Sequence, residues 1–435
     1  MIAAIETTSR QMFGIPEDVS LPRDANAADT PQDFQGMSFI PVAVRGGVRN
    51  GARERVADTV SRTPNLQVRL DALVTKVLLD DSGRAHGVEY RSGRRLYTAA
   101  PRRSDPRDPG RRVPDVPADP EPTIVRARKE VILAAGAFNT PQLLKLSGIG
   151  PRAELERWGV PVRVDAPGVG ANLHDRYEVA VTFGLDRDYP LFDGSPLDVP
   201  ADPSNPDALY QEWTDSRDGP YATNGSLAAL IAKSSVAGEA SDLIVFALPI
   251  DFHGYYPGYA REGAQHHDRL SILVLKAHTQ NRAGSVTLRS ADARDAPHIA
   301  FRYFEEGSPG FERDLTGVVD GVEIARAIAR NLETIGVREE LTPGTARSTR
   351  EQIAEFVRDE AWGHHACGTA KIGAADDPSA VLDGRFRVRG VPGLRVVDAS
   401  VFPDIPGFFI ASAVYLASEK AADDLLSEYG RPAGA

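Results

Sequence analysis

The stretch RARKEVILAAGAFNTPQLLKLSGIG (residues 126–150) decides the fold of this chain. After a charged start it contains the continuous apolar run VIL (131–133), which predicts a strand of a parallel sheet, buried on both faces. The small residues AAGA (134–137) leave room at the strand end, where parallel sheets hold their ligands. Thr140 then offers an N-cap hydroxyl, and Pro141 suits the first helical position. We predict a strand–turn–helix unit that either binds a ligand at its turn or only packs.

Composition excludes several classes of function. The chain has 435 residues, 42% of them hydrophobic and 26% charged, which is ordinary for a soluble globular protein of more than one domain. A formal net charge of -11 argues against a nucleic-acid partner. We expect no membrane span, and because the first residues do not form a signal peptide we expect a cytoplasmic location. The single cysteine excludes an internal disulfide framework and a cysteine-rich metal site, and we predict no metal site.

The segment GAFNTPQLLKLSGIG (136–150) resembles the second signature of the glucose–methanol–choline (GMC) family of flavoprotein oxidoreductases. The resemblance rests on the long spacing of Gly, Ala, Thr-Pro, Leu-Leu and Ser-Gly-Ile-Gly. An overlapping segment, GIGPRA (148–153), fits the dinucleotide pattern G-x-G-x-x-A. It follows a helix rather than a strand, and it has a proline where a phosphate-binding helix should begin. We therefore reject GIGPRA as a phosphate loop.

The segment WGHHACGT (362–369) contains the best catalytic candidate. It resembles the GMC segment in which a histidine precedes two small residues and Gly-Thr, and this match implies that His365 is the catalytic base. An unperturbed pKa of about 6.5 lets a histidine accept an alcohol proton near neutrality. Because neighbouring side chains of an extended segment point to opposite faces, we predict a structural role for His364. We predict that Cys367 is a buried apolar side chain.

The resemblance also implies which residues approach FAD, the cofactor of the family. Val74 matches a valine whose backbone meets the adenosine half, and Gly136 belongs to the signature. Asp398 and Ala399 match the family's VDAS segment, at the end of a predicted strand. The second catalytic position, which is His or Asn in most members, falls on Phe409, which carries no proton-handling group. His365 would then act without its usual partner, or with one from elsewhere.

The expected fold class is α/β, with a partial FAD-binding sheet domain and a substrate domain whose antiparallel sheet is flanked by helices. Residues 1–40 are expected to be the first piece of the substrate domain, and residues 41–178 the FAD-binding domain. Within the latter, residues 99–123 are rich in Pro, Arg and Asp and are predicted to be a disordered insert. Residues 179–360 complete the substrate domain, and residues 361–435 return to the FAD-binding domain.

Periodicity predicts the individual elements. Residues 1–40 show no strong helix or strand, and alternation predicts a strand at 65–70. Two strands of a meander are predicted at 74–79 and 87–90. Further predicted strands are 227–231, 243–248, 270–276, 284–288 and 394–397, and predicted helices are 51–62, 153–158, 311–331, 348–359 and 411–429. The helix at 311–331 places Val318, Val322, Ala325 and Ile328 on one face, and Ser348 with Glu351 is a predicted capping box.

Two further features bear on the family resemblance. The segment GVGANLHD (168–175) resembles the one that closes this part of the flavin domain, and we predict that His174 is structural. The strand–G-x-G-x-x-G–helix unit with which the family begins does not occur in this sequence. We therefore expect a GMC-type fold that is truncated at its N-terminus.

The function that the resemblance implies is FAD-dependent oxidation of a small-molecule alcohol, with hydride transfer to the flavin and His365 as the base. Two alternatives stay open. The chain could be an inactive remnant or a subunit that needs a separate flavin-binding part, or it could be an FAD-containing hydroxynitrile lyase. The sequence does not indicate the electron acceptor or the oligomeric state.

Overall fold

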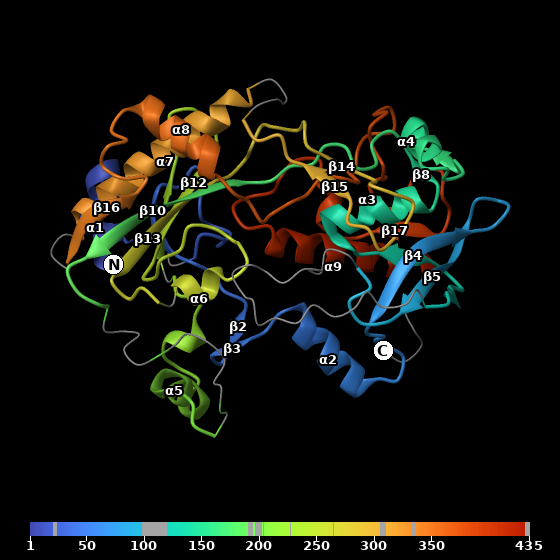
Figure 1. Ribbon diagram of the computed structural model, residues 1–435, viewed down its shortest axis with the longest axis horizontal. Coiled ribbons are helices and arrows are strands. Elements are labelled where there is room, and N and C mark those ends of the chain that lie inside the picture. Colours follow the sequence, from blue (N-terminus) through green and yellow to red (C-terminus); the bar gives the residue numbers. More distant parts are fainter. Residues whose placement is uncertain are drawn as a thin grey trace. The chain divides into compact units, whose positions relative to one another are not determined.

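The structure, a computed structural model, describes residues 1–20, 24–97, 120–189, 195, 202, 204–226, 228–263, 265–304, 310–332 and 336–430. The chain forms two compact units (Figure 1). Unit 1 consists of Met1–Val68, Tyr177–Ala277 and Glu312–Trp362, and unit 2 consists of Arg69–Arg176, His278–Phe311 and Gly363–Ala435.

The two units differ from the predicted domains in two places. Residues 41–68 belong to unit 1, where the Trp213 indole donates a hydrogen bond to the Gly47 carbonyl. Residues 278–311 belong to unit 2, because their strands pack beside the helix that follows residue 135 and the Lys145 ammonium donates to the Val286 carbonyl. Neither contact leaves a local signal in the sequence.

Unit 1 is built on a six-stranded antiparallel sheet of order β1-β11-β12-β13-β10-β16 (Figure 1). The strands are β1 (Gly36–Phe39), β10 (Tyr177–Leu185), β11 (Ala228–Ala232), β12 (Leu243–Leu248), β13 (Arg269–Lys276) and β16 (Val337–Thr342). The predicted antiparallel sheet is confirmed in β11, β12 and β13. The predicted strand at 284–288 lies instead in unit 2, and β10 was not predicted.

Helix α7 (Glu312–Arg330) packs on β13, β12 and β10 and supplies one side of the core. Val318, Val322, Ala325 and Ile328, which share one helical face, are all fully buried, as the spacing predicted. Helix α8 (Arg350–Glu360) packs on α7. Its N-cap is Thr349 rather than Ser348. The Thr349 hydroxyl accepts a hydrogen bond from the Gln352 amide, and the Gln352 side-chain oxygen accepts one from the Thr349 amide.

The prediction that residues 1–40 contain no strong helix or strand is wrong for strand β1 and for helix α1 (Ile2–Phe13). Helix α1 buries Ile5 and packs on β1 and β11, so tertiary burial stabilises a segment with a weak local signal. The predicted strand at 65–70 is also wrong. Its alternating apolar side chains stay exposed, Leu70 to 79%, since no neighbouring strand pairs with this segment in the described part of the chain.

The remaining elements of unit 1 are short or peripheral. They are the hairpin β2 (Val44–Arg45) and β3 (Val48–Arg49), α2 (Ala52–Arg62), α5 (Ala208–Ser216), the 3₁₀ turn η2 (Pro220–Ala222) and α6 (Tyr259–Gly263).

Unit 2 contains the predicted meander. It is a three-stranded antiparallel sheet of β4 (Ala72–Leu79), β5 (Ala85–Ser92) and β6 (Thr123–Arg126). Of the predicted disordered insert at 99–123, residues 99–119 lie outside the described residues, and Thr123 already belongs to β6.

The organising strand of unit 2 is β7 (Val131–Leu133), which pairs in parallel with β17 (Leu394–Val396). Val131 and Leu133 join the hydrophobic core together with Leu394 and Val396. The predicted burial on both faces is wrong at Ile132, which is 46% exposed. A run of three apolar residues is too short to distinguish one buried face from two.

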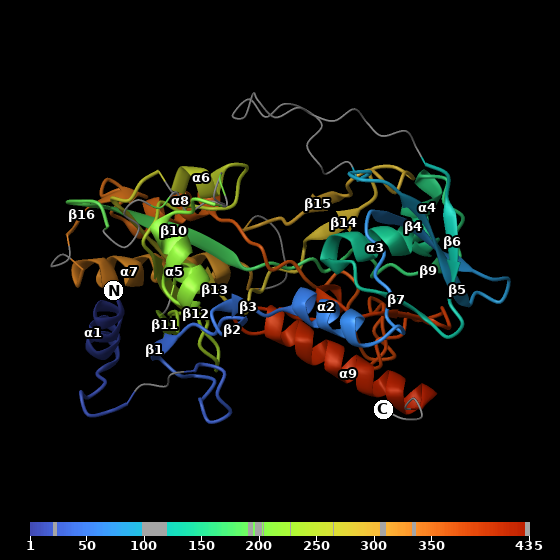
Figure 2. The ribbon, with the colours of Figure 1, turned by 90° about the horizontal axis from the view of Figure 1, so that it is seen from below.

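Helices and small sheets surround this parallel pair. They are α3 (Gly136–Leu146), β8 (Ile149–Gly150), α4 (Arg152–Arg157), β9 (Val164–Asp165), β14 (Ser285–Thr287), β15 (His298–Ala300), the 3₁₀ turn η4 (Ala399–Val401) and α9 (Ala411–Tyr429). Figure 2 shows α9 side-on over its whole length. Both units together confirm the predicted α/β fold class with an antiparallel sheet flanked by helices.

A buried ion cluster ties the end of α9 to the parallel strands. The fully buried Arg395 guanidinium of β17 contacts Glu130, with Nε 2.6 Å from Oε2, and it also contacts Glu428 at the end of α9. The Tyr429 hydroxyl donates to the same Glu130 carboxylate at 2.6 Å. The attraction between these opposite charges and the hydrogen bonds within the cluster offset the cost of removing the charges from water.

Candidate active site

Helix α3 begins at the carboxyl end of β7, earlier than predicted. Its first residue is Gly136, and Thr140 is not its N-cap. The Asp398 carboxylate takes the capping position instead, since its Oδ2 accepts the Gly136 amide at 3.0 Å and the Thr140 hydroxyl at 2.6 Å. A carboxylate at a helix N-terminus is stabilised by the helix dipole. Asp398 comes from the end of β17, so the cap joins the two parallel strands.

Pro141 lies inside α3 rather than at its first position. A proline has no N–H, so it leaves the carbonyl four residues earlier, that of Ala137, without its helical donor. The Thr369 hydroxyl supplies the missing hydrogen bond at 2.6 Å, and Thr369 is fully buried. The segment that carries the two adjacent histidines is therefore fastened to α3.

This histidine segment also runs along residues 172–176. The backbones of His174 and Cys367 exchange two hydrogen bonds of 3.1 and 3.0 Å. The Asn172 side chain accepts from the His174 ring nitrogen at 3.0 Å and donates to the Gly368 carbonyl at 3.2 Å. Burial lowers the pKa of His174 to about 4, so this ring is a neutral, packed side chain. These contacts agree with the structural role predicted for His174.

The two adjacent histidines do not point to opposite faces. Their ring centroids lie 4.1 Å apart, with His365 buried and His364 exposed. The prediction failed because residues 363–366 are not in a strand, so the alternation of a pleated backbone does not apply. The two side chains therefore differ in their exposure to solvent and not in the face to which they point.

The buried His365 ring is held in its neutral form. Desolvation lowers its pKa to about 3, and the neighbouring His364 ring and Arg176 guanidinium act in the same direction. The ring can therefore accept a proton at neutral pH, but it is a weaker base than the ordinary histidine that the sequence suggested. The Phe409 ring lies beside it, with centroids 5.8 Å apart. Phe409, which the family resemblance places at the second catalytic position, thus packs beside His365 and carries no proton to donate.

Cys367 behaves as a core residue. It is fully buried, and burial raises the pKa of its thiol to about 12. The thiolate is therefore scarcely populated at neutral pH, and the side chain serves as packing.

Three of the residues predicted to bind FAD gather at one end of the parallel strands. Asp398 caps Gly136, and the carbonyl of Ala399 accepts the Gly368 amide at 3.2 Å. Gly136 has a φ of 80°, and no described atom lies within 4 Å of the position of an added Cβ. Its neighbours Ala134 and Ala135 are exposed. Open space beside a small-residue turn at the carboxyl ends of parallel strands fits a dinucleotide cofactor such as FAD.

Val74 lies on a different part of unit 2. It belongs to β4, pairs with Tyr90 of β5, and is followed by a bulge before Lys76. Strand β4 packs against α3, which connects Val74 to the helix that Gly136 begins. The structure brings Gly136, Asp398 and Ala399 together, and it does not give Val74 a direct contact with them among the described hydrogen bonds.

The rejected phosphate motif is closed by the protein itself. Helix α4 is six residues long, and its first amide, that of Arg152, donates to Asp165 at 3.1 Å. An added Cβ on Gly148 would lie 2.4 Å from the Pro161 carbonyl. This glycine therefore serves close backbone packing.

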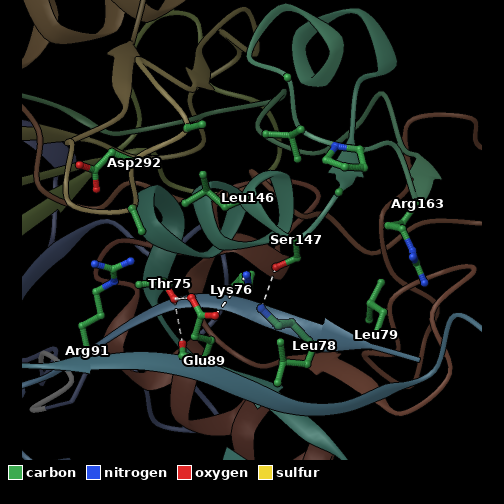
Figure 3. Close-up of a pocket in the computed structure, with 17 residues that line it drawn as sticks. Thr75, Lys76, Leu78, Leu79, Glu89, Arg91, Leu146, Ser147, Arg163 and Asp292 are labelled. Atoms are coloured by element: carbon green, nitrogen blue, oxygen red, sulfur yellow. Dashed lines mark hydrogen bonds and ion pairs between the residues drawn. The ribbon is translucent and has the colours of Figure 1, made fainter. Parts of the chain in front are cut away.

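A cavity of about 580 Å³ lies over β4, beside the end of α3 (Figure 3). Its charged side chains pair with neighbours, as in the contact of 3.2 Å between Lys76 and Glu89. The Ser147 hydroxyl accepts the Val77 amide at 2.8 Å. None of the residues predicted to bind FAD is among those that line this cavity. We assign it no part in catalysis.

The sequence indicates no function for Asp175, the last residue of the segment GVGANLHD (168–175). The Asp175 carboxylate accepts the His365 amide at 2.8 Å, and burial raises the pKa of its carboxyl group to about 6. An acidic residue that closes a glycine-rich segment was the only local signal.

No helix within the described ranges is both long and apolar enough to cross a lipid bilayer.

Comparison with known proteins places the chain in a family. Two family models, both described as GMC oxidoreductase, match residues 12–178 and 279–418. The chain is 32% identical over 394 residues to the oxygen-dependent choline dehydrogenase of Brucella anthropi, which covers 90% of this chain and 64% of that protein. It is 29% identical over 407 residues to the protein of the same name from Rhizobium johnstonii, covering 92% of this chain and 66% of that protein.

Solved structures agree at the level of the fold. A variant of the formate oxidase of Aspergillus oryzae superposes with a TM-score of 0.76 at 21% sequence identity, covering 98% of this chain and 70% of that chain. The present chain thus spans about two thirds of the length of the proteins it resembles. With both of its ends matched by models of one family, the chain belongs to the GMC oxidoreductases.

Proposed function

We propose that this chain carries the alcohol-oxidising site of an FAD-dependent oxidoreductase, with His365 as the base that accepts the substrate's hydroxyl proton. The observation that carries this proposal is the buried, neutral His365 ring, whose segment is fastened to the helix that begins at Gly136. FAD is the cofactor of the family, and it is named in the description of the formate oxidase variant.

The residues that would hold FAD are those at the ends of the parallel strands. The exposed turn at Gly136, capped by Asp398, and the neighbouring Ala399 would line one side of the cofactor. Val74 would contribute its backbone and Phe409 its ring. Bound FAD supplies the acceptor for the hydride that leaves the substrate carbon.

The chain's own residues handle the proton. Oxidation of an alcohol releases a hydride from carbon and a proton from oxygen, and a carbonyl group forms. His365 would take the hydroxyl proton on a ring nitrogen, which requires the neutral imidazole that burial favours. The half-buried Phe409 would exclude water from this ring and would donate nothing to the substrate. The proton would then pass from His365 to solvent, because a ring with so low a pKa does not hold it at neutral pH.

Choline is the first substrate to test, because the Brucella and Rhizobium relatives are named for it. Primary and secondary alcohols without a charge form the comparison set. The protein, loaded with FAD, is mixed with each alcohol in the absence of oxygen, and loss of the visible flavin absorbance is followed. Reduction by at least one alcohol is expected. Failure with every alcohol would contradict the proposal, and release of cyanide from hydroxynitriles would favour a lyase.

The role of His365 is tested by His365→Ala. We expect flavin reduction to slow by about 10²-fold or more, because a positioned base is lost. His364→Ala is the matched control, since it removes the adjacent exposed ring and leaves the buried one. It should change the rate by less than about tenfold. Equal losses in the two variants would contradict the assignment of the base.

A further inference from the structure

Asp175 is a buried carboxylate beside the proposed base. Its side chain belongs to a residue that is 3% exposed, and its Oδ1 accepts two backbone amides, that of His365 at 2.8 Å and that of Arg176 at 2.7 Å. Thr279 holds the backbone at this point, since its hydroxyl donates to the Asp175 carbonyl at 2.9 Å. The hydroxyl of Tyr303 lowers the pKa of this carboxyl group. The Asp175 carboxylate is therefore held in place by contacts from several segments of the chain, and the histidine segment is one of them.

The histidine segment passes close against this carboxylate. An added Cβ on Gly363 would lie 2.6 Å from Asp175 Cγ and 2.4 Å from the Arg176 carbonyl. Glycine thus allows the backbone to approach until the His365 amide reaches Oδ1. Two residues further on, Cys367 is paired with His174 by two backbone hydrogen bonds. His365 therefore lies between Gly363, which packs against Asp175, and Cys367, which pairs with His174.

The backbone amide of His365 is one bond from the Cα that carries its ring. A hydrogen bond to that amide limits rotation about the N–Cα bond and so limits the positions that the imidazole can reach. A displacement of a catalytic group by about 1 Å can lower a rate by about 10²-fold. The ring position therefore depends on an acceptor that belongs to a distant part of the chain.

We propose that Asp175 is a positioning residue for His365, and that its ionisation sets how the proposed reaction responds to acid. This inference rests on the proposed function, since it assigns a role within the same site. A carboxylate is a better acceptor than a neutral carboxyl group, because charge-assisted hydrogen bonds are stronger. As pH falls and Asp175 takes up a proton, its hold on the His365 amide weakens.

The groups that face Asp175 determine where it titrates. Burial is the largest influence and raises the pKa of its carboxyl to about 6, while the amides of His365 and Arg176, the Tyr303 hydroxyl and the Arg176 charge act in the opposite direction. The Cys367 thiol stays neutral, since its own pKa is raised to about 12. His365 itself stays neutral until its pKa of about 3. Acid inactivation near pH 6 would thus come from Asp175, well before His365 is protonated.

Two substitutions distinguish the effect of the Asp175 side-chain oxygen as a hydrogen-bond acceptor from the effect of its negative charge. Asp175→Asn keeps a side-chain oxygen that can accept the His365 amide, but it cannot titrate. Because its amide is uncharged, as the protonated carboxyl group is, we expect its flavin-reduction rate at neutral pH to be lower than the original by up to about tenfold, and we expect no further loss of activity near pH 6. Asp175→Ala removes the acceptor, and we expect about a 10²-fold slower rate at every pH.

A readout without substrate or flavin turnover complements the rates. In protein labelled with ¹⁵N-histidine, the ring signal of His365 is identified by its absence in a His365→Gln sample and is then followed against pH. In the original protein the His365 ring signal should shift near pH 6, where Asp175 takes up its proton and weakens its hold, whereas in Asp175→Asn, which cannot titrate, no change should occur at that pH. In Asp175→Ala a released ring should titrate closer to the ordinary pKa of about 6.5.

Thr59→Val is the matched control, because it removes a hydroxyl of the surface helix α2 and leaves Asp175 and its hydrogen-bond partners in place. Its pH–rate profile and its His365 signal should match those of the original protein. The inference is overturned if Asp175→Ala leaves both readouts unchanged, or if Asp175→Asn keeps the loss of activity near pH 6. If no alcohol reduces the flavin, the proposed function fails, while the ¹⁵N titration still decides the positioning role. If Asp175→Ala does not fold, Asp175→Asn provides the decision.

Discussion

Replacing Thr369 with valine should destabilise unit 2 by an amount that depends on Pro141. The Thr369 hydroxyl donates to the Ala137 carbonyl at 2.6 Å, and Pro141 has no N–H to take its place. Thr369 is fully buried, so the variant leaves a carbonyl without a donor and without access to water. A lost hydrogen bond that leaves a buried group unsatisfied costs about 1–3 kcal/mol. We expect the free energy of unfolding of unit 2 to fall by that amount.

A double-mutant cycle isolates this effect from other consequences of the substitution. In a Pro141→Ala background, the new amide at position 141 can donate to the Ala137 carbonyl, so Thr369→Val should cost less there, by about 1 kcal/mol or more. The measurement is urea unfolding combined with hydrogen exchange of the α3 amides, which reports on unit 2. As a control, Thr59→Val in α2 removes a hydroxyl from a surface helix, and it should change stability by less than about 0.5 kcal/mol. An equal cost of Thr369→Val in both backgrounds would refute the reasoning.

Two other predictions concern buried charges. The pKa of His174 is lowered to about 4, while the unfolded chain takes up this proton near 6.5, so stability should fall as pH drops through this window. His174→Gln should remove up to about 3 kcal/mol of that loss, measured by urea unfolding at several pH values; an unchanged pH dependence would contradict it. Arg395→Met leaves Glu130 buried without its cation and should cost about 3–5 kcal/mol. Arg395→Met with Glu130→Gln should recover part of this cost, and a double variant as unstable as the single one would contradict the ion-pair explanation.

Elements with strong periodicity could be predicted from the sequence. The buried face of α7 and strands β12 and β13 follow from apolar spacing alone. Helix α1 was missed because its helix is stabilised by packing on β1 and β11 rather than by local propensity. The N-cap of α3 was misplaced for a related reason. Its capping group, Asp398, is 262 residues away in the chain, so no local pattern could reveal it.

The candidate site was predictable in its residue types but not in its geometry. The family resemblance indicated His365, and the structure adds the burial that keeps this ring neutral. The relation of His364 to His365 was wrong, because a rule for strands was applied to a segment that is not a strand. The hold of Asp175 on His365 joins two segments that are 190 residues apart, and only the folded chain shows it.

The pairing of β7 with β17 has a consequence for how the chain is made. The hydrogen bond between Gly136 and Asp398 that accompanies this pairing spans 262 residues. At a synthesis rate of about 5–20 residues per second, the ribosome needs roughly 10–50 seconds to produce the partner strand after β7 has emerged. During that time the apolar residues of β7 have no parallel neighbour to cover them. We therefore expect the nascent chain to remain incompletely folded for most of its synthesis and to depend on chaperones that shield exposed apolar strands.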